Sequence, residues 1–233
     1  MKIKKNIFIA CDTLDKNKVK KIIKETKTKK LNIGYKFGLE FFYSKSGRSF
    51  LSKMNSKKTI FLDLKLNDIP QTCLAAVNSI KDLKNCRYIT AHANGGLNML
   101  RAIKKEVKKI NKKIKVLGVT VLTSIDNKSL KQIGYSKTIE NLVLHQFNLC
   151  KLAGLDGIVC SAKETILLKD KIKNLEIICP GIRFANNKTN DQKRITTAKD
   201  AFYKYNASAI VIGRPITQGN IKKNLRKLIK HLK

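Results

Sequence analysis

The sequence contains no tryptophan, and none of its basic stretches is interleaved with aromatic residues. It has few acidic residues, 16 Asp and Glu against 50 Lys and Arg, which gives a formal net charge of +34. Such a charge can indicate a polyanionic partner such as nucleic acid. The lysines are spread over the whole chain beside many Asn and Ile residues, however, and all three types have A/T-rich codons. We therefore attribute the charge to composition and expect it to steer small anions rather than to bind nucleic acid.

Signatures of zinc sites and of membrane insertion are also missing. The six cysteines form no CxxC pair and no histidine cluster accompanies them, so we expect no metal site. Scattered cysteines in a chain of 233 residues are typical of a reducing compartment. The apolar stretch at residues 7–10 is too short for a signal-peptide core, and no apolar run approaches the length of a membrane span. These absences predict a soluble, cytoplasmic protein.

Short β-rich runs alternate with longer, lysine-rich amphipathic segments. Most of the β-rich runs are continuously apolar, as expected of strands that are buried on both faces. Eight strands are predicted, at residues 6–10, 33–37, 59–63, 88–91, 115–121, 157–160, 176–179 and 208–213. Three helices are the clearest of those between and after the strands, at residues 14–26, 139–153 and 220–232. Eight β-then-α units predict one α/β domain over residues 1–233, a (β/α)₈ TIM barrel.

Helix signals and one irregular stretch complete this prediction. Gly154 is expected to end the second of these helices and Asn220 to cap the third. The least structured stretch is residues 181–194, and a loop of that length is usually functional or disordered.

Polar residues follow the predicted strands at their carboxyl ends, where the active site of a TIM barrel lies. The third strand is the most informative, because it runs into Asp63, Lys65 and Asp68. Asp63 and Lys65 are two apart on a predicted extended backbone, so both side chains should point into the barrel mouth. A structural salt bridge is the commoner reason for such a pair. Two carboxylates around a lysine at the end of an apolar strand nevertheless require compensation for their desolvation. Pro70 is expected to begin the next helix.

Residues 61–72, which read FLDLKLNDIPQT, closely resemble the signature of orotidine 5′-monophosphate decarboxylases. Asp12 matches the aspartate of the family's first strand, and Lys36 matches the lysine of its second strand. Another register would place Asn32 at the lysine position, but it loses the match of the residues that follow Lys36. The resemblance covers nearly the whole chain, with further matching segments at residues 35–42, 92–96, 119–124, 154–161, 180–183, 191–194 and 211–215.

The resemblance implies conversion of orotidine 5′-monophosphate to uridine 5′-monophosphate, the last step of UMP (pyrimidine) biosynthesis, with no cofactor and no metal. Lys65 would stabilise the carbanion at C6 of the pyrimidine by its charge and then protonate it. Lys36, Asp63, Lys65 and Asp68 would form an alternating charge network that keeps all four ionised. In the family, the second carboxylate and the threonine after it, here Asp68 and Thr72, come from the neighbouring subunit. This implies a homodimer with shared active sites.

The same resemblance implies the groups that bind the substrate. Asp12 and Lys36 would contact the ribose, and Thr123 and Ser124 the pyrimidine, whereas His92 is expected to be structural. The 5′-phosphate would be held by Gln192, Gly213 and Arg214, and Arg183, also expected to bind the substrate, would begin the loop that closes over it.

Two departures from the family pattern fall between the phosphate-binding segments. Phe184 stands where the family has proline, and Asn190 where it has glycine. Without the proline, this segment should lose more conformational freedom when it closes. The alternative is that Phe184 compensates by packing its ring against the barrel rim.

Two other functions stay open. A Mg²⁺-dependent sugar-phosphate decarboxylase or aldolase of the same superfamily shares the Asp-x-Lys-x-x-Asp pattern. The Asp68-Ile69-Pro70 continuation and the nine-residue step from Arg183 to Gln192 argue against it. A basic nucleic-acid-binding protein on a decayed barrel is the second alternative. Such a protein would have no reason to retain the whole set of charged site residues.

Overall fold

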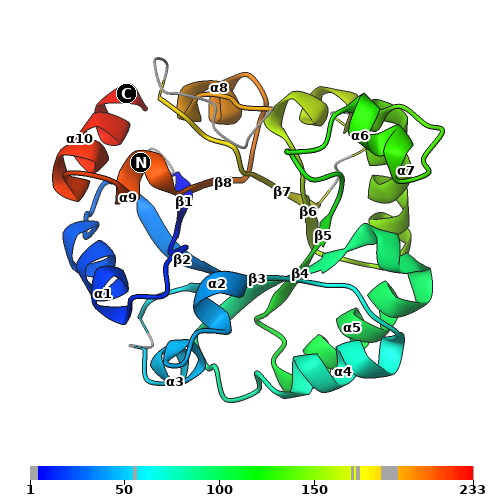
Figure 1. Cartoon of the computed structure of the whole chain (residues 1–233), viewed down its shortest axis with the longest axis horizontal. Coiled ribbons are helices and arrows are strands. Elements are labelled where there is room, and N and C mark those ends of the chain that lie inside the picture. The colour runs from blue at the N-terminus through cyan, green and yellow to red at the C-terminus, as the bar shows by residue number, and fades with distance from the viewer. Residues whose placement is uncertain (1–4, 55–56, 169–170, 172–173, 185–193, 233) are drawn as a thin grey trace.

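The computed structural model describes residues 5–54, 57–168, 171, 174–184 and 194–232, and eight parallel strands close into a barrel at its centre (Figure 1). The last strand pairs with the first, so the sheet closes on itself. The TIM barrel and all eight predicted strands are confirmed, with small differences at the strand ends. The strands are β1 (Asn6–Ala10), β2 (Asn32–Gly38), β3 (Ile60–Leu66), β4 (Cys86–His92), β5 (Lys115–Val119), β6 (Gly157–Val159), β7 (Glu176–Cys179) and β8 (Ala209–Ile212).

Helices surround the barrel on its outer side (Figure 1). The α-helices are α1 (Lys16–Glu25), α2 (Leu39–Phe42), α3 (Gly47–Ser52), α4 (Pro70–Asn78), α5 (Gly96–Ile110), α6 (Asn127–Gln132), α7 (Ile139–Leu152), α8 (Ala198–Tyr203), α9 (Arg214–Thr217) and α10 (Ile221–His231). Two 3₁₀ helices join them, η1 (Ala93–Gly95) and η2 (Ala162–Leu168). Within the described ranges, every helix falls short of the length or apolar character that crossing a membrane requires.

The local signals that predicted these helices act as expected. The side chain of Asn220 accepts a hydrogen bond from the Lys223 amide and so caps α10. Gly154 follows α7 with a φ of +72°, the left-handed conformation that ends helices. Pro70 occupies the first position of α4, where its missing N–H costs no hydrogen bond.

Alternate residues of the strands build two apolar layers. In β1, Ile7 and Ile9 belong to the large core that includes the helices, whereas Phe8 belongs to a separate cluster with Phe61 of β3. The rings of Phe8 and Phe61 meet edge to face with centroids 5.1 Å apart. A buried side chain of this size contributes about 1.5–3 kcal/mol relative to exposure. The eight strands therefore form a rigid frame, and their carboxyl ends can hold polar groups in place.

Strand β3 departs from the extended backbone that we predicted for it. Lys65 has a φ of 51°, in the left-handed region that residues other than glycine rarely adopt. Leu62 pairs with Ile89 and Leu66 with Ala91, so three residues of β3 lie opposite one residue of β4. The extended backbone predicted through Lys65 was therefore wrong, because the strand has a β-bulge here. The prediction that Asp63 and Lys65 both point into the barrel mouth is confirmed, since both line the cavity there.

Candidate active site

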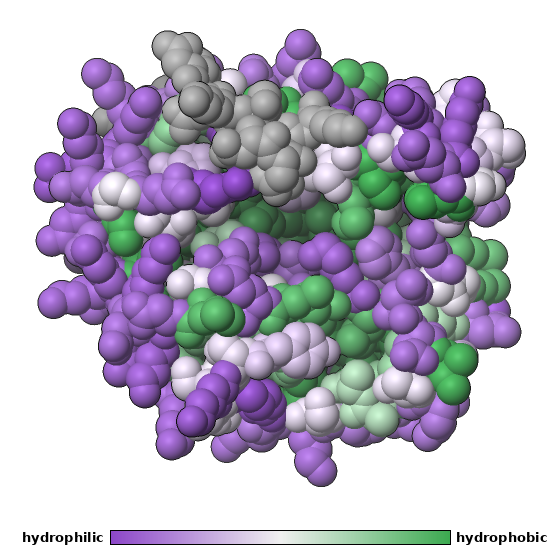
Figure 2. All heavy atoms as spheres, in the orientation of Figure 1, coloured by the Kyte–Doolittle hydropathy of each residue, from purple (hydrophilic) through white to green (hydrophobic). Residues whose placement is uncertain are grey.

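A cavity of about 570 Å³ opens at the carboxyl ends of the strands. Figure 2 shows a hollow near the centre of this face, with apolar residues at its floor and hydrophilic residues around it. Val119 and Val211 are among its apolar lining residues. The cavity is also lined by nine residues that the sequence singled out, Asp12, Lys36, Asp63, Lys65, Thr123, Ser124, Arg183, Gly213 and Arg214.

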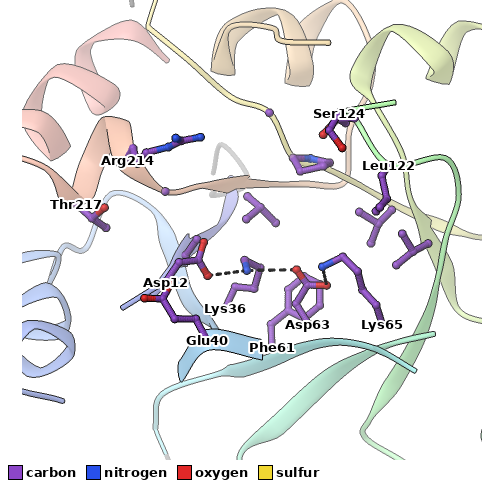
Figure 3. A pocket seen from close by; sticks show the side chains of 18 of the residues that line it. Asp12, Lys36, Glu40, Phe61, Asp63, Lys65, Leu122, Ser124, Arg214 and Thr217 are labelled. Atoms are coloured by element: carbon purple, nitrogen blue, oxygen red, sulfur yellow. Dashed lines mark hydrogen bonds and ion pairs between the residues drawn. The ribbon is translucent and has the colours of Figure 1, made fainter. Parts of the chain in front are cut away.

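Four charged side chains form a continuous row across one side of the cavity (Figure 3). Lys36 Nζ lies 3.1 Å from Asp12 Oδ1 and 3.2 Å from Asp63 Oδ2. Lys65 Nζ lies 2.9 Å from Asp63 Oδ1. The charges therefore alternate from Asp12 through Lys36 and Asp63 to Lys65. The two lysines of the row differ in two ways. Lys36 contacts two carboxylates and its side chain is 10% exposed, whereas Lys65 contacts one carboxylate and its side chain is 30% exposed.

Burial and charge act in opposite directions on the two inner members of this row. Burial by itself would lower the pKa of Lys36, but the nearby Asp63 and Asp12 outweigh it, and the pKa is raised. Burial would raise the pKa of Asp63, but Lys36 and Lys65 outweigh it, and the pKa is lowered. Both groups are therefore charged at neutral pH.

The position of Lys36 supports the register that we chose for the second strand. Lys36 lies near the carboxyl end of β2 and lines the cavity. Asn32 is the first residue of the same strand, at the opposite end of the barrel. Its side-chain Nδ2 donates a hydrogen bond to Asn6 Oδ1 there, at 3.1 Å. Gly38 gives the row room, because a Cβ atom there would lie 3.3 Å from Lys36 Nζ and 3.4 Å from Asp12 Oδ1.

Two residues predicted for the site lie outside the cavity of their own chain, and a third falls outside the described residues. Asp68 is exposed, and its Oδ1 accepts a hydrogen bond from the Ile69 amide at 2.7 Å. Thr72 is also exposed, on α4, and neither residue lines the cavity. Gln192 lies outside the described residues, as does Asn190. Within one chain, the network predicted for two lysines and two aspartates thus ends at Lys65, and Asp12 extends it at the other end, beside Lys36.

Comparison with known proteins identifies the family of the chain that carries this arrangement. Residues 5–227 match the model of the orotidine 5′-phosphate decarboxylase / HUMPS family. The chain belongs to this family. Curated proteins named orotidine 5′-phosphate decarboxylase are similar to it: one from Carboxydothermus hydrogenoformans is 39% identical over 90% of this chain and 88% of its own, and one from Wolbachia pipientis is 43% identical over 79% and 80%. A crystal structure of orotidine 5′-phosphate decarboxylase from Lactobacillus acidophilus has a TM-score of 0.82 and 28% identity, and the match covers 98% of this chain and 99% of that one.

Phe184, one of the two departures from the family pattern, is packed rather than loose. Its side chain is 6% exposed and belongs to the main apolar core. Lys227 Nζ of α10 lies 4.6 Å from the centre of its ring. The alternative that Phe184 packs its ring is therefore confirmed. That this packing compensates for the missing proline stays a prediction.

Two residues to which sequence reasoning gave no role support the site from behind. Arg194 pairs with Glu164 and donates to the carbonyls of Val121 and Leu122 at 3.0 and 2.7 Å. These carbonyls directly precede the Thr123–Ser124 segment, so Arg194 fixes its start. The second residue is Thr90 of β4, which contacts both Asp63 and the backbone of Lys65. No local pattern distinguishes either residue, since both contacts depend on elements far apart in the chain.

The other polar groups beside the cavity show no sign of a metal site. Among the described residues, no three His, Cys, Asp or Glu side chains gather closely enough to hold a metal ion. All six cysteines are buried free thiols. His92 lies half-buried at the end of β4, and burial, followed by the charge of Lys65, lowers its pKa. Its structural role stays a prediction.

Proposed function

We propose that this protein decarboxylates orotidine 5′-monophosphate to uridine 5′-monophosphate and CO₂, a carboxy-lyase reaction that completes de novo UMP synthesis. The observation that supports this most directly is the alternating row from Asp12 to Lys65 at the barrel mouth. It belongs to a chain that is 35–43% identical to curated proteins named for this activity. The row ends in the partly exposed ammonium group of Lys65, which lines the cavity.

Lys65 supplies both the charge and the proton that this reaction needs. The bond between C6 and the carboxylate breaks, the electron pair stays on C6, and CO₂ leaves. The ammonium group of Lys65 stabilises that negative charge and then transfers a proton to C6, which gives the product. The neutral amine regains a proton from water. Preorganised charge of this kind is usually the largest single contribution to catalysis.

Asp63 prepares Lys65 for this step. The Asp63 carboxylate contacts Lys65 and Lys36 from opposite oxygens, so it holds the Lys65 ammonium in a fixed place. Its lowered pKa keeps it charged, and its charge in turn raises the pKa of Lys36. Asp12 and Lys36 bind the ribose hydroxyls at the start of the row. Asp12, with a side chain 53% exposed, is open to a ligand.

The opposite side of the cavity binds the phosphate. Arg214 and Gly213 follow β8, where TIM barrels often bind phosphate, and Figure 3 shows Arg214 across the cavity from Asp63 and Lys65. Arg183, after β7, contributes a second guanidinium group, and Gln192 is proposed as a further contact. Arginine suits this role because its planar donors match phosphate oxygens. Thr123 and Ser124 then border the pyrimidine between the phosphate site and the lysine.

A homodimer completes the site in this proposal. Asp68 and Thr72 of a second copy would reach the cavity that they do not reach in their own chain. Their exposure supports this, as does Ile69 between them, an apolar side chain that is 66% exposed. We also propose a single domain and a cytoplasmic location, which the six free thiols favour.

The proposed function is tested by the loss of absorbance when purified protein is mixed with orotidine 5′-monophosphate, with and without EDTA. We expect turnover at the same rate in both. A folded protein without turnover would refute the proposal. Turnover that EDTA abolishes and Mg²⁺ restores would favour the metal-dependent branch of the family. Retention on DNA that falls with salt, without turnover, would favour the nucleic-acid alternative.

Replacement of Lys36 tests the row itself. We expect Lys36→Ala to lower kcat/KM by at least about 100-fold, because Asp63 loses one cation and the ribose loses a contact. Asn32→Ala should stay within about threefold of wild type, since an exposed hydrogen bond contributes about 0.5–1.5 kcal/mol to stability only. Steady-state kinetics on both variants measures this. The reverse order would mean that the second-strand lysine is not part of the site.

A further inference from the structure

Thr90 lies opposite the β-bulge that carries Asp63 and Lys65 of the proposed site. Its side chain is fully buried on β4, at 0% exposure. Because Leu62 pairs with Ile89 and Leu66 with Ala91, Thr90 is the one β4 residue that faces the Asp63–Lys65 segment. We propose that Thr90 is a positioning residue, whose hydroxyl sets the placement of Lys65 and Asp63 for proton transfer. This inference rests on the function proposed above.

The hydroxyl of Thr90 makes two hydrogen bonds, one in each direction. It accepts from the Lys65 amide at 2.8 Å and donates to Asp63 Oδ1 at 3.1 Å. A hydroxyl group can do both, whereas an apolar side chain of the same shape can do neither. One buried atom thus connects the backbone of the proton donor to the carboxylate that orients its ammonium group.

The contact to the Lys65 amide holds an unfavourable backbone conformation. Lys65 adopts a φ of 51°, which is strained for a residue with a side chain. Such strain persists only where surrounding contacts determine it, and strained residues gather at functional sites. The bulge interrupts the regular pairing of β3 with β4 at this point, and the Thr90 hydroxyl accepts the hydrogen bond of the Lys65 amide. Without the hydroxyl, the bulge loses the contact that stabilises it.

The contact to Asp63 fixes the carboxylate itself. Asp63 Oδ1 receives Lys65 Nζ and the Thr90 hydroxyl, and Oδ2 receives Lys36 Nζ. The lysines reach it through long flexible side chains, whereas Thr90 is β-branched and has few rotamers. Thr90 is therefore the rigid member of the three donors. Its hydrogen bond also favours the charged carboxylate.

Thr90→Val tests the proposal, because it removes the hydroxyl and keeps the shape. We expect the single-turnover rate with orotidine 5′-monophosphate to fall about 10- to 100-fold, as for the loss of a hydrogen bond to a charged group. The Michaelis constant should change less than about threefold, since the phosphate contacts are intact. The acid limb of the kcat/KM profile should move to higher pH, because the carboxylate loses a donor and its pKa rises. The Lys65 amide, measured by NMR, should exchange faster with deuterium.

Two variants separate positioning from simple packing. Thr90→Ser keeps the hydroxyl and should stay within about threefold of wild type in rate and in Lys65 amide exchange. Thr120→Val removes another buried threonine hydroxyl, which donates to the Val159 carbonyl at 3.1 Å. It should leave the rate and the acid limb unchanged. If Thr90→Val does not fold, Thr90→Cys, which has weaker hydrogen bonds, takes its place with the same expected directions.

A Thr90→Val rate within twofold of wild type would overturn the proposal. So would a Thr90→Ser variant as slow as Thr90→Val, since the missing methyl group would then be the cause. Unchanged exchange of the Lys65 amide would also contradict it, and this measurement needs no substrate. A wild-type protein that does not turn over orotidine 5′-monophosphate would refute the proposed function, while amide exchange would still decide whether Thr90 holds the bulge.

Discussion

Lys65→Ala is expected to lower turnover of orotidine 5′-monophosphate by about 10⁴-fold or more. A positioned proton donor contributes about 10²–10⁴-fold, and a preorganised charge about 10²–10³-fold. The single substitution removes both at once. The barrel should stay folded, because the Lys65 side chain is 30% exposed and contacts one carboxylate rather than the apolar core. Steady-state and single-turnover assays measure the loss, and circular dichroism checks the fold.

Lys21→Ala is the matched control, since Lys21 is an exposed lysine on α1 outside the cavity. It changes the net charge of the protein as Lys65→Ala does, so it corrects for weaker steering of the anionic substrate. Its turnover should equal that of wild type. If Lys65→Ala retained turnover within about tenfold, a barrier change of only about 1.4 kcal/mol, Lys65 would not be the proton donor.

The second large effect is recovery of activity when two inactive variants are mixed. Asp68→Ala and Lys65→Ala should each be nearly inactive as purified proteins. After subunit exchange, a mixed dimer has one site with Lys65 from one chain and Asp68 from the other. An equal mixture should therefore regain about a quarter of wild-type activity, because about half of the dimers are mixed and each has one complete site.

The double variant Lys65→Ala/Asp68→Ala provides the control for this experiment. Mixed with either single variant, it cannot form a complete site, so no activity should return. Subunit exchange is followed independently, by mass spectrometry of tagged chains. Exchange without recovery would mean that Asp68 acts within its own chain. The Asp68 side chain would then have to move away from its exposed position, where it accepts a hydrogen bond from the Ile69 amide.

The sequence by itself predicted the barrel and nine residues of the cavity lining, because both follow from local patterns. Strands buried on both faces favour continuous apolar runs, and most of the eight strands of the barrel have them. Parallel strands of a barrel place all their carboxyl ends together, so polar residues after different strands had to meet. Lys36 and Arg214 could therefore be assigned to one cavity although 178 positions, 214 minus 36, separate them.

Only the tertiary structure decided how the proposed proton donor is held. An extended strand was expected through Lys65, but the pairing of β3 with β4 creates a bulge there. Thr90 resembles any threonine in a buried strand, and its importance depends on the register of its neighbour. The contacts of Arg194 and Phe184 could not be predicted from the sequence either, because their partners lie on elements distant in the chain. Periodicity determines which face of a strand is buried, whereas contacts between strands determine which hydroxyl, amide and carboxylate meet.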